Sequence, residues 1–184
     1  MPTGHGTPHS ARSAALSLWR DGSYAGVSLV YWCAVCLLHP RNAQSATALQ
    51  QAVPWLSPHG HDILGALVAC EGRTRPVEAF AHNAGFTSRH QLARVLQRDG
   101  LPPLEELGAW IYVLERLWDW EMSHVSLCKS ALWSGEDPGD HYRRVQRLCG
   151  VRWSEARAMG FNQVLVRFVQ RCGSRDLQRE QSAV

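Results

Sequence analysis

The chain has 184 residues, of which 45% are hydrophobic and eight are tryptophan, and this composition excludes a disordered protein and fits a folded core. Its formal net charge of +3 is too small to indicate a class of partner by itself. No segment reaches the roughly 18 apolar residues that span a bilayer, so we expect no membrane partner and a cytoplasmic location.

The six cysteines are scattered, and the one close pair, Cys33 and Cys36, is followed by His39 but by no second close pair. Because a zinc site needs further ligands at metal-like spacing, we interpret the cysteines as reduced thiols, with a metal or redox site as the alternative. The sequence also has no glycine-rich phosphate loop, nucleophile elbow or His-Glu metal signature. We therefore expect no metal, no cofactor, no catalytic residue and no enzyme activity.

The first third of the chain, residues 1–57, has no clean periodicity, and its role stays unassigned. Residues 1–12 are rich in Gly, Pro and His and are predicted to be disordered. Apolar stretches predict a short helix over 14–19, a strand or buried helix over 27–38, and a helix over 46–55.

From residue 61 onward the pattern is helical. After a first apolar helix, a second helix is predicted over Pro76–Asn83 and a third over Ser88–Arg98. Gly85 separates the last two, because glycine adopts positive φ at no steric cost, and Thr87 or Ser88 caps the third helix.

A long helix without a strong breaker is predicted over Leu104–Met122. It is followed by a helix over Leu127–Trp133, a turn at Gly135 and a helix over Pro138–Leu148. A closing apolar helix then precedes a polar tail, residues 174–184.

The chain repeats itself at an offset of 50 residues, because residues 81–105 and 131–155 share a spacing of small, apolar and basic residues. The matched positions include Ala81 and Ala131, Gly85 and Gly135, Arg94 and Arg144, Val95 and Val145, and Gly100 and Gly150. Two copies of one supersecondary unit follow from this repeat. Two short helices joined by a tight glycine turn are typical of a helix-turn-helix.

We therefore predict an all-α fold, with one domain over residues 58–173. In this domain two helix-turn-helix units, about 76–98 and 126–148, are joined by a linker helix at about 104–122.

This layout resembles the DNA-binding domain of the AraC/XylS transcription regulators, over roughly residues 60–160. Residues 79–96 are similar to the A-x-x-x-G-[FM]-S-x-x-x-L-x-R-x-F pattern of that family, and residues 131–157 are similar to its second signature. The resemblance implies a sequence-specific regulator whose two units enter adjacent major grooves of double-stranded DNA. RNA polymerase and a second copy of the chain are further candidate partners.

Two features of the second unit depart from the family. Glu136 and Trp153 stand where the family prefers an aromatic residue and a proline, and residues 136–140 are acidic, which repels phosphates. These departures motivate an alternative function, a non-enzymatic protein-interaction module that retains the fold but has lost specific DNA binding.

The resemblance places the second helix of each unit in the major groove, where its first residues contact base edges. The candidate base-reading residues are Ser88, Arg89, His90, Gln91 and His141. The candidate phosphate-contacting or positioning residues are Thr87, Arg94, Arg143, Arg144, Arg147, Arg152 and Arg157. The alternative for all of them is an ordinary solvated face, and Arg94 has the further alternative of a structural bridge to Glu105 or Glu106.

The tryptophans at helical spacing, Trp110, Trp118 and Trp133, are predicted to pack helices together. Stacking on single-stranded bases is the alternative.

Overall fold

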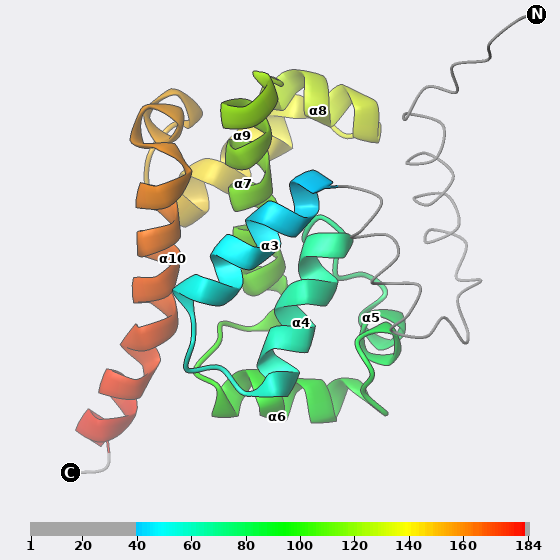
Figure 1. Cartoon of the computed structure of the whole chain (residues 1–184), viewed down its shortest axis with the longest axis vertical. Helices are drawn as coiled ribbons and strands as arrows, with labels where there is room; N and C mark the ends of the chain where they lie inside the picture. The colour runs from blue at the N-terminus through cyan, green and yellow to red at the C-terminus, as the bar shows by residue number, and fades with distance from the viewer. Residues whose placement is uncertain (1–39, 183–184) are drawn as a thin grey trace, which may run out of the picture.

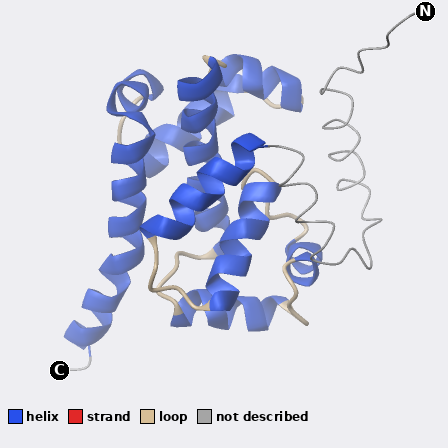
Figure 2. Ribbon diagram, viewed as in Figure 1, coloured by secondary structure: helices blue, strands red, loops and turns tan. Residues whose placement is uncertain are grey.

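The computed structural model describes residues 40–182, with the side chains of residues 44–173. All regular elements in this part of the chain are α-helices, which confirms the predicted all-α class (Figure 2). The expectations for residues 1–12, 14–19 and 27–38, and for Cys33 and Cys36, lie outside the described residues.

The helices follow the predicted pattern closely from residue 58 onward. Their bounds are α3 Pro40–Ala52, α4 Pro58–Ala69, α5 Val77–Asn83, α6 Arg89–Arg98, α7 Leu104–Ser123, α8 Leu127–Ser134, α9 Pro138–Cys149 and α10 Trp153–Ser182. Helix α3 begins and ends earlier than predicted, and α10 continues into the segment expected to be a tail. Gly160, with φ of 80°, interrupts α10 near its start.

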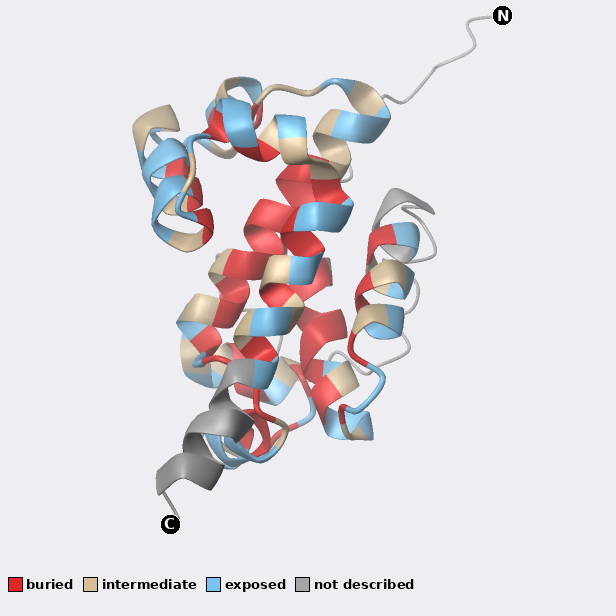
Figure 3. Cartoon of the chain, turned by 90° about the vertical axis from the view of Figure 1, so that its left-hand side faces the viewer, coloured by how far each residue is buried: buried red, intermediate tan, exposed pale blue. Residues whose placement is uncertain are grey.

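Helix α7 is the centre of the molecule, and its buried residues include Leu107, Ile111 and Leu114 (Figures 1 and 3). Helices α10, α4, α9, α3 and α8 all contact it. The apolar faces predicted along these helices therefore converge on one core, which also includes Phe161 and Phe168 of α10.

Two helix pairs lie toward opposite ends of the molecule in Figure 1, the first pair being α5 and α6 and the second pair α8 and α9. Their backbones repeat one plan. Gly85 and Gly135 end the first helix of each pair with φ of 83° and 68°, and Gly100 and Gly150 end the second with φ of 69° and 70°. Only glycine adopts this left-handed region without strain, so the repeated glycines fix matching turns. The assignment of these pairs as helix-turn-helix units stays a prediction.

The tryptophans divide into two groups. Trp110 is buried and Trp118 packs against the core, as predicted. The prediction for Trp133 is wrong, because this side chain is 52% exposed and lies beside the ammonium group of Lys129, at 4.8 Å. Helical spacing alone placed Trp133 on a buried face, but α8 ends one residue later and that face meets solvent.

Among the described helices, none combines the length and the apolar character that crossing a membrane requires.

Candidate anion-binding cleft

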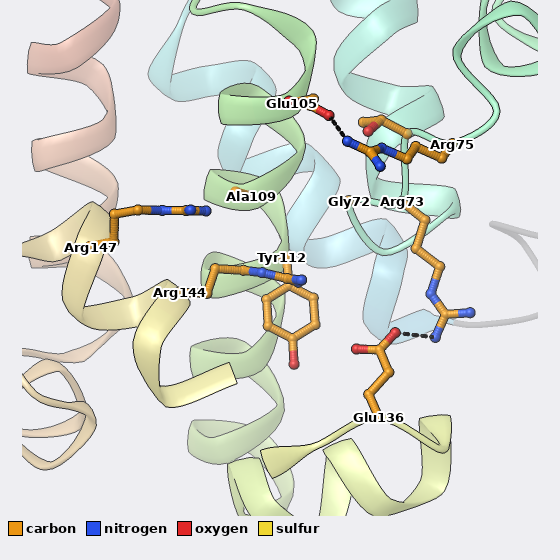
Figure 4. Close-up of a pocket in the computed structure, with 10 residues that line it drawn as sticks. Gly72, Arg73, Arg75, Glu105, Ala109, Tyr112, Glu136, Arg144 and Arg147 are labelled. Carbon is orange, nitrogen blue, oxygen red and sulfur yellow. Dashed lines mark hydrogen bonds and ion pairs between the residues drawn. The ribbon is translucent and has the colours of Figure 1, made fainter. Parts of the chain in front are cut away.

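A cleft of about 500 Å³ lies between the α4–α5 loop, the N-terminal half of α7 and the second helix pair (Figure 4). It is lined by Gly72, Arg73, Thr74, Arg75, Glu105, Ala109, Tyr112, Glu136, Arg144 and Arg147. Four of these residues are arginines and two are glutamates, so the lining carries two positive charges in excess. The cleft therefore favours an anionic ligand.

The α4–α5 loop reaches the cleft because two glycines let its backbone approach α7. A Cβ at Gly108 would lie 2.5 Å from the carbonyl oxygen of Gly72, a distance that side-chain atoms do not tolerate. Gly72 itself has φ of 74°, in the left-handed region. The Cys70 thiol donates to the carbonyl oxygen of Arg73, at 2.8 Å, and burial raises the pKa of Cys70 to about 12, so the thiol keeps its proton.

Two of the arginines are paired with the two cleft glutamates. The guanidinium of Arg75 donates to Glu105 at 2.5 Å, and this hydrogen bond lowers the pKa of the Glu105 carboxyl. The guanidinium of Arg73 lies 3.7 Å from Glu136, which belongs to the α8–α9 turn. Figure 4 shows the two pairs at opposite ends of the cleft.

The other two arginines, half-buried Arg144 and exposed Arg147, belong to α9 and point into the cleft (Figure 4). The Arg144 guanidinium lies over the ring of Tyr112, 4.5 Å from its centroid, and this cation–π contact fixes its position. Arg147 forms no ion pair with any residue in the described part of the chain. Its charge acts on Glu105 across the cleft and helps to lower the pKa of that carboxyl.

Behind the cleft wall, Tyr112, His141 and Glu136 form a chain of polar contacts. The Tyr112 hydroxyl meets Nδ1 of His141, and Nε2 of the same ring lies 2.8 Å from a Glu136 carboxylate oxygen. His141 is only 1% exposed, and burial lowers its pKa, so its imidazole is neutral at neutral pH. Burial also raises the pKa of Tyr112, which keeps its proton.

A buried ion cluster joins the cleft loop to the second helix pair. Arg116 of α7 contacts Glu71 at 3.1 Å and Asp119 at 3.2 Å, and it donates to the hydroxyl of Ser130 in α8. Its side chain is 5% exposed, so these partners compensate a charge that has left water.

Of the residues predicted to contact DNA, the cleft includes only Arg144 and Arg147. His141 was expected to reach a base, but it is buried behind the cleft, since its ring packs against Tyr112. Arg143 pairs with Asp140 and lies 3.8 Å from Asp137, so the acidic start of α9 compensates its charge.

The candidate residues of α6 lie away from the cleft. Ser88 caps α6 by accepting from the backbone N–H of Gln91 at 3.3 Å, and Gln91 accepts from the backbone N–H of Thr87 at 3.0 Å. Arg89, His90 and Arg94 are exposed.

The two remaining arginines that were predicted to contact or position DNA make local contacts in the described structure. The backbone N–H of Arg152 donates to Glu155 at 3.0 Å, and the Arg157 guanidinium lies over Trp120 at 4.4 Å. The alternative of a bridge from Arg94 to Glu105 or Glu106 does not appear in the described structure, where Glu105 pairs with Arg75 and Glu106 pairs with Arg171, at 2.7 Å.

Sequence reasoning missed Arg73, Arg75 and Tyr112. The close pair of arginines in a loop was a visible signal, but nothing local indicated that this loop faces α9.

The described residues gather no cluster of three or more His, Cys, Asp or Glu side chains that could hold a metal ion.

Comparisons with known proteins give two curated relatives. The chain is 29% identical over 115 residues to "3-deoxy-manno-octulosonate cytidylyltransferase 1" of Actinobacillus pleuropneumoniae serotype 5b (strain L20). It is equally similar to "3-deoxy-manno-octulosonate cytidylyltransferase" of serotype 7 (strain AP76) of the same species. The match covers 62% of this chain and 43% of each relative, so the chain spans less than half the length of the curated relatives it matches. No family model matches the chain, and no solved structure does.

These relatives contradict the functional expectations from the sequence. The AraC/XylS resemblance, the DNA-binding regulator and the absence of enzyme activity are all wrong by this comparison, because the matched proteins are named as cytidylyltransferases. The alternative of a non-enzymatic interaction module falls with them. The second helix pair gives a physical reason why these side chains do not present a DNA-reading face. His141 is buried, the charge of Arg143 is compensated by aspartates, and Arg144 points into the cleft.

Proposed function

We propose that the cleft binds the phosphate groups of a nucleoside triphosphate and that the protein takes part in nucleotidyl transfer as an enzyme. The observation that carries this proposal is the convergence of four arginines on one cleft of about 500 Å³. Guanidinium groups bind phosphate oxygens through two parallel hydrogen bonds, which makes arginine the usual residue for this task. The names of the two relatives support a cytidine nucleotide and the acceptor 3-deoxy-manno-octulosonate.

The four arginines would act in two ways. Arg144 and Arg147 are open to a ligand, and Arg144 is already oriented by Tyr112. Arg73 and Arg75 would exchange their carboxylate partners for phosphate oxygens, since both of those pairs lie at the cleft surface. The pair of Arg75 with Glu105 is strongly exposed, and exposed ion pairs are weak and easily broken.

Arginines in this position serve the chemistry as well as binding. Cytidylyl transfer from CTP forms a bond between the acceptor oxygen and the α-phosphorus, and it breaks the bond to the leaving pyrophosphate. Guanidinium groups on the β- and γ-phosphates stabilise the charge that builds up on this leaving group.

The test is isothermal titration of the full chain with CTP, with cytidine as the uncharged control. We expect CTP to bind and cytidine to bind far more weakly, because the cleft recognises phosphates. Release of pyrophosphate from CTP in the presence of 3-deoxy-manno-octulosonate would then establish the transfer. Equal, weak binding of CTP and cytidine would contradict the proposal.

A further inference from the structure

His141 links the buried core to the charge state of the cleft. Its Nε2 contacts one oxygen of Glu136 at 2.8 Å, and the other oxygen of the same carboxylate faces Arg73 at 3.7 Å. Glu136 is therefore shared between a buried imidazole and a cleft arginine. Its side chain is 40% exposed, so it connects His141 to solvent.

The charged groups around His141 come from three elements. Helix α7 contributes Arg116 and the neutral hydroxyl of Tyr112, α9 contributes Arg144, and the α8–α9 turn contributes Glu136. Burial and the two arginines disfavour a positive imidazole, whereas Glu136 favours it. Glu136 is thus the one group in this set whose charge favours protonation of His141. Because Glu136 also faces Arg73, its negative charge is shared between the imidazole and the arginine.

We propose that His141 is a positioning residue of the cleft and that it takes up a proton when an anion binds. This inference rests on the proposed function, since it requires that phosphates occupy the cleft. A phosphate bound to Arg73 takes away the counterion of Glu136. The carboxylate then keeps its contact with His141, whose protonated form replaces Arg73 as the counterion. The negative phosphates nearby act in the same direction.

The proton balance is simple. We assign to the neutral ring the tautomer with its proton on Nε2, which lies 2.8 Å from a Glu136 oxygen, so that Nδ1 accepts from the Tyr112 hydroxyl. When the anion binds, one proton from solvent joins Nδ1, and Nδ1–H then donates to the Tyr112 oxygen. No covalent bond between heavy atoms changes. His141 would also hold Glu136 at the cleft wall, so that it returns to Arg73 when the ligand leaves.

Anion binding raises the pKa of His141. The affinity for the anion therefore increases as the pH falls through the range in which His141 is protonated with the anion bound and neutral without it. Because burial sets the pKa of the empty form below its ordinary value of 6.5, affinity should rise as the pH falls from neutral toward this range. One titrating group changes affinity by at most about tenfold per pH unit.

The test measures proton uptake on CTP binding by isothermal titration of the full chain in several buffers of different ionisation enthalpy, near pH 6.5. The variants are His141→Gln, which keeps a donor but cannot titrate, and Glu136→Gln, which removes the carboxylate charge. His90→Gln is the matched control, because His90 is exposed and lies outside the cleft lining. The titration of CTP itself is common to all four proteins and cancels in their differences.

We expect the wild type and His90→Gln to take up the same number of protons, and more than either of the other variants. The difference should be clearly above zero and at most one proton, and the extra fall of Kd toward lower pH should disappear in both. Equal proton uptake in all four proteins, with CTP bound, would overturn the role of His141 and leave the cleft proposal intact. If CTP does not bind the wild type, the proposed function fails and this inference fails with it. Glu136→Gln keeps the test decisive if His141→Gln does not fold, since Glu136 is partly exposed.

Discussion

The two helix pairs share a backbone and differ in how they join the rest of the molecule. The first pair contacts α4 through α6, whereas the second pair contacts both α7 and α10. At position 80 the first pair has a phenylalanine that is 2% exposed, and at the repeated position 130 the second pair has a buried serine bound by Arg116. The first pair is therefore attached by apolar packing and by hydrogen bonds from Ser57 to Asp99 at the end of α6, and the second by packing together with a buried charged network.

The same contrast holds for the repeated arginines. Arg94 on α6 is exposed, while Arg144 at the matching position of α9 lies over Tyr112 in the cleft. A repeat in sequence thus fixed matching turns, but the neighbour that each copy meets decides what its side chains do. Four sets of variants test the two pairs and the central helix α7.

The largest effect is expected for Arg116→Gln. This change leaves the carboxylates of Glu71 and Asp119 without their shared buried partner. Breaking a buried pair in this way costs about 3–5 kcal/mol of unfolding free energy. Urea unfolding followed by circular dichroism measures it, with Arg94→Gln as the control that changes little. Equal stability of the two variants would show that the cluster does not hold the second pair.

The next effect concerns ligand binding. The double variant Arg144→Gln/Arg147→Gln removes two cleft arginines, and each charged hydrogen bond contributes about 1.5–3 kcal/mol. We expect a loss of CTP affinity of about 100-fold or more. The matched control is Arg89→Gln/Arg94→Gln on α6, which removes the same charge and should leave the affinity almost unchanged. Equal losses in both double variants would mean that binding follows net charge and that the cleft has no special role.

A third effect lies on α7, away from both pairs, where burial raises the pKa of Glu115 to about 8. Above its ordinary value of 4.5 the unfolded chain releases this proton while the folded chain keeps it, so stability falls as the pH rises toward 8. The slope should be about 1.4 kcal/mol per pH unit at most. Glu115→Gln should remove this slope in urea unfolding at pH 5, 6 and 7, and it should be more stable than the wild type at pH 7. An unchanged slope would show that the carboxyl is ionised in the folded protein.

The smallest effect tests the shared backbone. A Cβ at Gly85 or at Gly135 would meet no atom within 4 Å, so alanine at either site costs only the strain of positive φ. We expect Gly85→Ala and Gly135→Ala each to lose about 1 kcal/mol of unfolding free energy. Clearly different losses would show that the two turns do not carry the same strain.

Much of the fold was predictable because its signals are local. Apolar periodicity, serine caps and glycine stops placed α5 to α9 within about one residue of their observed ends. The end of α3 was harder, because this part of the sequence has no clean periodicity and apolar residues continue past Ala52.

The cleft was not predictable from the same signals. It depends on the close approach of Gly72 to Gly108 and on the face that α9 turns toward α7, and both arise from tertiary packing. The burial of His141 has the same cause, since its partner Tyr112 lies 29 residues away in sequence. The spacing of the arginines on α9 predicted contacts with phosphates. Which of these arginines are available to an anion depends on the residues with which they pair.

We propose that the second helix pair, and not the first, provides the anion site. An NMR titration of the arginine Nε–H resonances with CTP tests it directly. We expect the signals of Arg144 and Arg147 to shift with CTP, together with that of Arg73, while those of Arg89 and Arg94 stay in place. Shifts confined to the arginines of α6, or equal shifts on both helices, would contradict it.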